Sequence, residues 1–446
     1  MRKNKTIIGK IEKVEFPNKS TISSNDRELK TKGGILGQVV EAKISRRSKG
    51  KITKVLERSG LEGKSNCIHF DECGGCTYQT MSYDDEINYK KTLLKGLYKE
   101  IGIEDFEIIK SPSHKEYRNK MEYTFSDEYI DGPLTLGLHK KAKFYETVNT
   151  EECNIVDQDF NTIHTFTRKY FDGKIKPYHR TKHQGKLRHL LLRRNQKGQM
   201  LVNLVTSSEE YDYTDYFEEV KKLEIKGEIV GIIHTINDSL SDAVIPEKVS
   251  VYYGQDYLIE EILGLKFKIS LYSFFQTNTQ SAKVLYQEAI NMLEETEGLQ
   301  ILDLYSGTGT ITQILGQSAK KAIGIEIVEE AVQAARENAK ENKLENVEFI
   351  CGDVFKEVKN LDFKPDLIVL DPPREGINPK AIGDIINFDA KKYLYISCNP
   401  VTQVRDLKEF MERGYKIEKF EIVDQFPRTY HVEAAILMTY CGLDKE

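Results

Sequence analysis

Tryptophan is absent from this chain of 446 residues, and only 7 cysteines occur in it. No stretch approaches the roughly 20 consecutive apolar residues that a membrane-spanning helix needs, which excludes a helical membrane protein. The charged start, residues 1–5, is not followed by an apolar segment, so no secretory signal peptide is expected. Together these absences predict a cytoplasmic protein without a membrane partner.

A cytoplasmic location limits what the few cysteines can do, because a reducing compartment disfavours disulfides. The cysteines are therefore expected to be metal ligands, a nucleophile or inert core thiols. Without tryptophan, any stacking on nucleic-acid bases depends on the 24 tyrosines, the 19 phenylalanines, histidine or arginine.

The charge of the chain is unevenly distributed, although its formal net value is only −5. Residues 1–58 contain 16 Lys and Arg against 6 Asp and Glu, a local charge of +10. A basic module on an acidic body is expected where one module contacts the phosphates of RNA or DNA. A solvated, flexible basic end is the alternative.

Three segments that differ in their pattern of apolar residues and turns predict three domains, and 446 residues are enough for three. Residues 1–60 alternate short apolar runs with glycine turns, a pattern typical of a small β-barrel. Residues 61–265 combine a cysteine-rich loop, a helix over 82–101 with Ser82 as its N-cap, and mixed strands and loops. Residues 266–446 alternate helices and strands, which predicts a doubly wound α/β sheet.

A glycine turn follows the first buried strand of that sheet, in the string Asp303-Leu304-Tyr305-Ser306-Gly307-Thr308-Gly309. Glu326 ends the second strand, where an acidic residue can bind ribose hydroxyls, and Asp353 follows the third. The turn lacks a full G-x-G-x-x-G and the lysine of a phosphate loop. The sequence therefore gives no sign of a pyrophosphate-binding site, which favours S-adenosylmethionine over a dinucleotide as the cofactor.

A possible nucleophile and a possible base lie downstream, in the strings Ser397-Cys398-Asn399-Pro400 and His431-Val432-Glu433. Uracil carbon 5 is a poor nucleophile until a thiolate adds to carbon 6, and its proton must then be removed by a base. Cys398 follows a strand and Glu433 begins an apolar one, so both can lie at the sheet's ligand crevice. An inert buried cysteine and an ordinary solvated glutamate are the alternatives.

These strings together resemble the S-adenosylmethionine-dependent RNA 5-methyluridine methyltransferases of the 23S rRNA type. The matching strings are Phe274–Asn278, Asp303–Gly309, Gly324–Glu326, Asp371–Gly376, Ile396–Pro400 and Phe426–Glu433. The resemblance implies a Rossmann-like class I methyltransferase domain with Cys398 as nucleophile and Glu433 as base. It also implies cofactor contacts by Gln276, Tyr305, Gly307, Thr310, Glu326, Asp353 and Asp371.

The rest of the chain carries the resemblance further. Through Gly37–Ile44, residues 1–60 resemble a TRAM domain, an OB-like RNA-binding barrel, and residues 61–265 would form a central α+β domain. Cys67, Cys73, Cys76 and Cys153 are four soft ligands whose spacing suits zinc or a [4Fe–4S] cluster. The resemblance implies the cluster, with zinc as the alternative, in a structural role beside the RNA surface.

The expected partner is RNA, ribosomal RNA in preference to transfer RNA, bound by a monomer. Two basic stretches, 178–194 and 117–120, are candidates for phosphate contacts, with solvated charge as the alternative. Three other functions remain open: methylation of cytosine carbon 5, methylation of an amino nitrogen, and non-catalytic RNA binding. A nucleophilic cysteine in RNA cytosine enzymes usually follows proline, whereas Cys398 follows Ser397, and the other two functions leave Cys398 idle.

Overall fold

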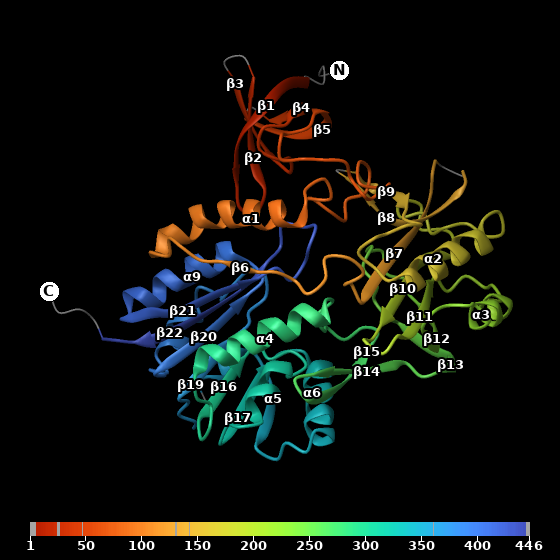
Figure 1. The fold of residues 1–446 in the computed structure, drawn as a ribbon. Helices are drawn as coiled ribbons and strands as arrows, with labels where there is room; N and C mark the ends of the chain where they lie inside the picture. Colours follow the sequence, from red (N-terminus) through yellow and green to blue (C-terminus); the bar gives the residue numbers. More distant parts are fainter. Residues whose placement is uncertain are drawn as a thin grey trace.

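Three β-sheet units are stacked along the molecule (Figure 1). The computed structural model describes residues 6–24, 27–46, 48–129, 132–141, 143–359 and 361–442, so the basic residues among 1–5 lie outside the described residues. In Figure 1 the N-terminal barrel (red) stands above the other two units, and the C-terminal α/β unit (teal and blue) lies beside and below the central sheet (yellow and green).

The N-terminal unit is a closed barrel with strand order β1-β2-β3-β5-β4. Its strands are β1 (Thr6–Glu15), β2 (Lys19–Ser24), β3 (Arg27–Lys32), β4 (Val39–Arg46) and β5 (Lys49–Glu57). Alternate residues point inward, so Ile11, Ile22, Leu29, Val40 and Ala42 form the buried core. A five-stranded barrel is the architecture expected of an OB-like domain, as the sequence predicted.

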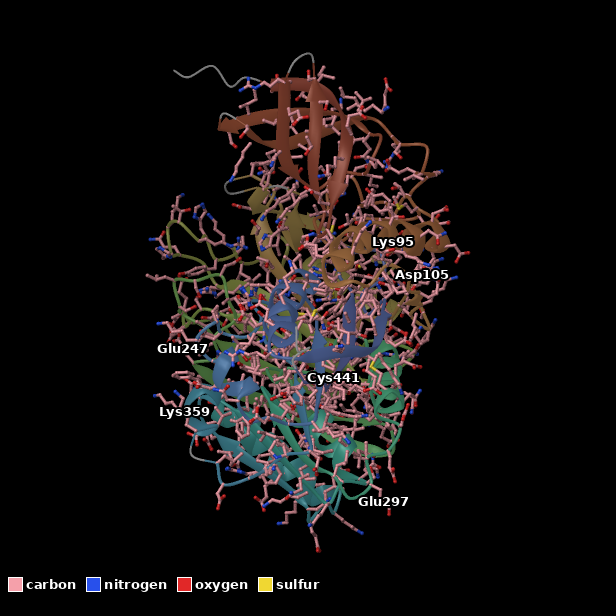
Figure 2. The ribbon with its side chains drawn as sticks, turned by 90° about the vertical axis from the view of Figure 1, so that its left-hand side faces the viewer. Lys95, Asp105, Glu247, Glu297, Lys359 and Cys441 are labelled. Carbon is pink, nitrogen blue, oxygen red and sulfur yellow. The ribbon has the colours of Figure 1, made fainter. Side chains whose placement is uncertain are left out.

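Helix α1 (Tyr83–Tyr98) joins the barrel to the rest of the chain. It begins where predicted, because the Ser82 side chain accepts a hydrogen bond of 3.1 Å from the Asp85 N–H. Lys95, labelled in Figure 2, lies on the exposed face of the helix, whereas Leu94 and Tyr98 are buried against the C-terminal unit. A short 3-10 turn, η1 (Lys99–Ile101), and strand β6 (Ile108–Ile109) follow.

The central unit is a seven-stranded sheet with order β13-β12-β11-β10-β7-β8-β9. Helices α2 (Gln158–Phe171) and α3 (Thr214–Lys221) pack on it, with contacts from α2 to β8 and from α3 to β12. The two-stranded sheet of β14 (Tyr257–Ile262) and β15 (Leu265–Ser270) leads into the C-terminal unit. The seven strands are β7 (Lys120–Asp127), β8 (Leu134–Lys140), β9 (Lys143–Asn149), β10 (Leu187–Arg194), β11 (Gln199–Thr206), β12 (Glu228–Ile236) and β13 (Lys248–Gly254).

The C-terminal unit is an eight-stranded sheet with order β18-β17-β16-β19-β20-β22-β21-β6. Strands β16 to β20 are parallel, and β22 enters antiparallel between β20 and β21. This confirms the predicted α/β, Rossmann-like fold class. The strands are β16 (Gln300–Leu304), β17 (Lys321–Glu326), β18 (Val347–Cys351), β19 (Leu367–Leu370), β20 (Lys392–Ser397), β21 (Tyr415–Val423) and β22 (Glu433–Tyr440).

Helices cover both faces of this sheet, since alternate strand residues point to opposite sides. Ile301 and Val369 face a core shared with α4, α5 and α6, whereas Leu302 and Ile368 face one shared with α1, α8 and α9. None of the helices in the described ranges is long and apolar enough to cross a membrane. The helices are α4 (Thr279–Leu293), α5 (Thr310–Gly316), α6 (Glu329–Glu341), α7 (Val354–Glu357), α8 (Ile382–Ile386) and α9 (Pro400–Glu412).

Candidate active site

The glycine turn between β16 and α5 is closed around the carboxylate of Glu326. The Gly307 N–H donates a hydrogen bond of 3.0 Å to Glu326 Oε2, and the N–H groups of Ile327 and Val328 donate to Oε1 at 2.9 and 3.0 Å. Three backbone donors fix this carboxylate at the carboxyl end of β17. Ligands of doubly wound sheets bind at these strand ends.

Gly309 cannot carry a side chain without disturbing the core beneath the turn. Its φ is +72°, and an added Cβ would overlap the ring of Phe349 on β18. We expect Gly309→Ala to lower the free energy of unfolding by about 2–4 kcal/mol, because backbone strain and overpacking add. Denaturant unfolding measures this. Gly298→Ala is the matched control, since Gly298 has a φ of +76° but open space around it. If both variants lost the same free energy of unfolding, overlap with Phe349 could not be the cause.

Two acidic residues at neighbouring strand ends are desolvated. Burial raises the pKa of Asp303, at β16, to about 7, and the nearby Asp371 and Glu326 add to the rise. Burial also raises the pKa of Asp371, which follows β19, to about 7. Asp303 accepts a hydrogen bond from the Thr312 hydroxyl, while its Oδ1 is buried without a partner. The two carboxyls therefore hold their protons until about neutral pH.

The other predicted cofactor residues lie around the same strand ends. Asp353 caps α7, accepting a hydrogen bond of 2.9 Å from the Phe355 N–H, and Thr310 begins α5. Tyr305 has a positive φ of 69°, and burial, with Asp353 nearby, raises its pKa to about 12. The carbonyl of Gln276 accepts a hydrogen bond of 3.0 Å from Asn119, which ties the central sheet to this region.

Cys398 lies between the carboxyl end of β20 and the start of α9, and its side chain is only half-buried. Burial raises the pKa of its thiol to about 11, with Glu433 and Asp371 contributing, while Arg374 opposes the rise through its charge and a hydrogen bond. The next residue, Asn399, caps α9 and donates a hydrogen bond of 2.7 Å to the Arg374 carbonyl. The turn after β20 thus holds Cys398 beside Arg374.

Glu433 begins β22, the strand next to β20, where Ser397 pairs with Ala434. Its side chain is only 4% exposed. Burial, with Asp371 nearby, raises the pKa of this carboxyl well above its usual value, and Arg374 opposes the rise. Cys398, Glu433 and Asp371 therefore share one desolvated region, with an exposed arginine at its edge.

Two residues of this region were not predicted as site residues. Arg374 stands within the string Asp371–Gly376, so its position after a strand-end aspartate was the available signal. Tyr286 of α4 is near Asp371, Glu433 and Asp303, whose charges add to the burial that raises the pKa of its hydroxyl. No local pattern in the sequence marks Tyr286, because its neighbours are far along the chain.

The four cysteines of the predicted metal site line one small cavity. Burial raises the pKa of Cys76 to about 12 and that of Cys153 to about 11, and the other thiols of the set contribute to both. Among the described residues, no group of three or more His, Cys, Asp or Glu side chains has the arrangement of a metal site. The four thiols therefore line the same cavity, but they do not form a set of ligands that meet at one metal position.

Part of the predicted basic rim over 178–194 is wrong. Arg188 and Arg193 are buried, and their guanidinium groups donate to backbone carbonyls, Arg188 to Asn237 and Ser239, and Arg193 to Ser273. Their strand, β10, lies in the middle of the central sheet, where a long cation can serve as a structural donor. The most exposed residues of the stretch, 181–184, precede this strand, and Arg180, Lys186 and Arg194 are partly exposed.

A doubly wound sheet with a glycine turn and acidic groups at successive strand ends defines a class I, S-adenosylmethionine-dependent methyltransferase. The family model for tRNA (uracil-5-)-methyltransferases matches residues 82–440. The chain therefore belongs to this family, and it is an S-adenosylmethionine-dependent RNA (uracil-5-)-methyltransferase.

Full-length relatives agree with the family. A protein from Caldanaerobacter subterraneus subsp. tengcongensis, named an uncharacterized RNA methyltransferase, is 46% identical over 448 residues, covering 98% of this chain and 99% of the relative. One of the same name from Clostridium tetani is 44% identical, covering 98% of each chain. The structure of Pyrococcus abyssi tRNA (uracil-54, C5)-methyltransferase with S-adenosyl-L-homocysteine matches with a TM-score of 0.77 at 24% identity, covering 97% of this chain and 100% of that one. This last likeness shows the fold.

Proposed function

We propose that this enzyme methylates carbon 5 of a uridine in RNA, with Cys398 adding to carbon 6 and Glu433 removing the proton from carbon 5. The observation that carries the proposal is the meeting of a half-buried thiol and a buried carboxylate at the ends of adjacent strands, β20 and β22. A cytosine enzyme also needs a nucleophilic cysteine, but that cysteine usually follows proline, whereas Cys398 follows Ser397, and a non-catalytic RNA-binding protein needs neither group.

The first step requires Cys398 to lose a proton. A thiol with a pKa of about 11 is almost entirely protonated at neutral pH, so it needs a nearby acceptor. Asp371, whose pKa is about 7, is close to the thiol and can accept this proton, which leaves the carboxylate of Glu433 free for the later proton of carbon 5. The sulfur then bonds to carbon 6 of uracil, the electron pair of the 5,6 double bond forms a 4,5 double bond, and the carbonyl pair moves onto the carbon 4 oxygen to give an enolate.

Arg374 is placed to oppose the negative charge in this step. Its side chain is exposed, hydrogen-bonds the thiol and favours the charged form of Glu433. A fixed cation beside a developing anion is an effective form of transition-state stabilisation. We assign to Arg374 the stabilisation of the thiolate as it forms.

S-adenosylmethionine, when bound, supplies the methyl group. We propose that Glu326 binds its ribose hydroxyls and Asp353 its adenine amino group, and that Gln276, Tyr305, Gly307, Thr310 and Asp371 complete the pocket. After carbon 5 has been methylated, Glu433 takes the proton of that carbon. The electron pair of the C–H bond re-forms the 5,6 double bond, and the sulfur of Cys398 leaves carbon 6.

The affinity for S-adenosylmethionine should rise with pH. Asp371, a pocket residue with a pKa of about 7, is mostly neutral at pH 6 and mostly ionised at pH 8, and a sulfonium cation binds better beside a carboxylate. We expect Kd to fall about tenfold from pH 6 to pH 8, as linkage to one proton predicts. Isothermal titration calorimetry measures it. S-adenosylhomocysteine, which lacks the sulfonium charge, should change less, and an equal change for both ligands would contradict the assignment.

We propose ribosomal RNA as the substrate, with residues 1–60 and 61–265 forming the RNA surface of a monomer and residues 266–446 the catalytic unit. The resemblance of the barrel and the cysteine set to 23S rRNA enzymes supports this. Transfer RNA is the second candidate, favoured by the family description and by the Pyrococcus abyssi neighbour. Mass spectrometry of 23S rRNA and tRNA fragments from a deletion strain tests both. Loss of 5-methyluridine from tRNA alone would reject the ribosomal proposal.

We also propose that Cys67, Cys73, Cys76 and Cys153 hold a [4Fe–4S] cluster. A single zinc ion needs all its thiolates within about 2.3 Å of one point, whereas a cluster takes thiolates spread around a larger group. The four thiols line one cavity, and the resemblance to the iron–sulfur site of related methyltransferases favours the cluster over zinc. The cluster would stabilise the fold of residues 67–80 and take no part in methyl transfer.

Anaerobic purification should yield a brown protein with about four iron atoms per chain. Cys76→Ser should lose most of this iron and unfold at a lower temperature. Elemental analysis and the visible absorption spectrum measure the first effect, and thermal unfolding measures the second. A colourless protein with one zinc per chain would contradict the cluster.

A further inference from the structure

Four buried charged side chains join helix α1 to the segment that precedes Glu433. Glu86 and Lys90 come from α1, and Asp424 and Arg428 come from residues 424–432, which connect β21 to β22. All four are less than 9% exposed, and their formal charges cancel. We call these four residues the charge cluster.

Each charge in the cluster has an opposite partner at short range. Lys90 Nζ lies 2.6 Å from Asp424 Oδ1 and 2.8 Å from Glu86 Oε1. Arg428 Nη1 lies 3.3 Å from Glu86 Oε2, and the Arg428 backbone N–H donates to Glu86 Oε1 at 2.7 Å. The hydroxyl of Tyr83 donates to the remaining oxygen of Asp424 at 2.9 Å.

Arg428 also ties the cysteine-containing segment, residues 67–80, to the same place. Its carbonyl accepts hydrogen bonds from the N–H groups of Thr77 and Tyr78, at 2.7 and 3.0 Å. Its guanidinium donates to the Met81 carbonyl at 2.9 Å. The φ of Arg428 is 69°, a strained value for a residue with a side chain, which the surrounding hydrogen bonds hold in place.

The position of Glu433 depends on this segment at both of its ends. Val423, the residue before Asp424, pairs directly with Glu433 across β21 and β22. The Thr429 hydroxyl accepts a hydrogen bond of 3.2 Å from the His431 N–H, two residues before Glu433. A shift of Asp424 or Arg428 would therefore be passed to the first residue of β22.

Stability alone is a weak explanation for such a cluster. Well-packed apolar side chains of similar volume often stabilise a protein as well as a buried ion pair does, because charges are costly to desolvate. Charged partners instead specify one arrangement of the segments that carry them. Segment 424–432 has to be held in register, since a small displacement of a catalytic group can cost about 100-fold in rate.

We infer that Arg428, with Glu86, Lys90 and Asp424, is a positioning residue for the carboxylate of Glu433 that removes the proton from carbon 5. The inference rests on the proposed function. It assigns to the cluster a specific effect on the last chemical step, because the turn that carries Cys398, after β20, and the glycine turn after β16 are held by other contacts.

Arg428→Met tests the inference, with Arg428→Lys as the conservative variant. After incubation with RNA and S-adenosylmethionine, we expect the methionine variant to accumulate a covalent, methylated RNA adduct on denaturing gels. Release of methylated RNA should slow by about 10- to 100-fold, while Kd for S-adenosylmethionine stays within about twofold. Arg428→Lys should restore part of the release rate. Asp84→Asn is the matched control, because Asp84 lies on the same helix α1 and forms an exposed ion pair with Lys110, outside the charge cluster.

A second variant covers the case in which Arg428→Met does not fold. Lys90→Met combined with Asp424→Asn removes one positive and one negative charge and leaves the Glu86–Arg428 pair. We expect this double variant to fold and to accumulate the adduct as well. The inference would be overturned if, in these variants, the rate of adduct formation fell as much as the rate of RNA release. It would also be overturned if RNA were released at the wild-type rate. If Glu433→Gln itself gives no adduct, the proposed function has failed. If only the cluster variants give none, the inference alone has failed.

Discussion

Cys398→Ala abolishes methylation of RNA while S-adenosylmethionine still binds: this is the largest effect that we expect from one substitution. Without the sulfur, carbon 5 of uracil keeps its low reactivity, and no other thiol lies in the region shared with Asp371 and Glu433 among the described residues. The rate should fall by at least about 10⁴-fold, the scale seen when a nucleophile is removed. Transfer of a radioactive methyl group to RNA in a single turnover measures it.

Cys441→Ala is the matched control, since Cys441 is exposed at the end of β22 and labelled in Figure 2. This variant should retain the wild-type rate. Calorimetry should give Kd values for S-adenosylmethionine within about twofold of wild type in both variants, because neither thiol belongs to the proposed cofactor pocket. Substantial methylation by Cys398→Ala would end the proposed mechanism.

Glu433→Gln should trap the enzyme on its RNA. The carboxamide keeps the shape of the side chain but cannot accept the carbon 5 proton, so the sulfur cannot leave carbon 6. We expect at most one methyl group transferred per enzyme and a turnover reduced by about 10²- to 10⁴-fold, the usual contribution of a general base. Denaturing gels show the adduct as a slower band that carries both RNA and the methyl label.

Glu421→Gln provides the comparison for this substitution. Glu421 is a half-buried carboxyl on β21 in the same sheet, where burial also raises its pKa, but it lies outside the site. It should turn over like wild type and give no accumulated band. Multiple turnovers by Glu433→Gln without an adduct would show that another group removes the proton.

The sequence predicted the elements whose signals are local. Asp303, Glu326 and Asp353 each end or follow a buried strand, so the strand-end rule placed them at one edge of the sheet. Cys398 and Glu433 could be paired in the same way, although only the fold shows β22 inserted beside β20. Strand β21 gives no comparable signal, because its sequence mixes Lys and Glu with apolar residues.

Features that depend on distant contacts could not be predicted. Glu86 and Arg428 are 342 positions apart, and no local pattern indicates that they meet. The basic stretch around Arg188 and Arg193 was interpreted from composition as a rim for phosphates, but β10 occupies the middle of the central sheet and buries both side chains. Whether a charged side chain in a strand is buried or exposed depends on the neighbouring strands, and the sequence alone does not show which strands these are.

The most direct measurement is to identify the sulfur that bonds to uracil. RNA in which 5-fluorouridine replaces uridine should stay attached to the wild-type enzyme in the presence of S-adenosylmethionine, because a base cannot remove fluorine from carbon 5. Mass spectrometry of the digested adduct should find the nucleotide, carrying one methyl group, on the peptide that contains Cys398. A nucleotide on any other cysteine, or methylated product released without an adduct, would contradict the account.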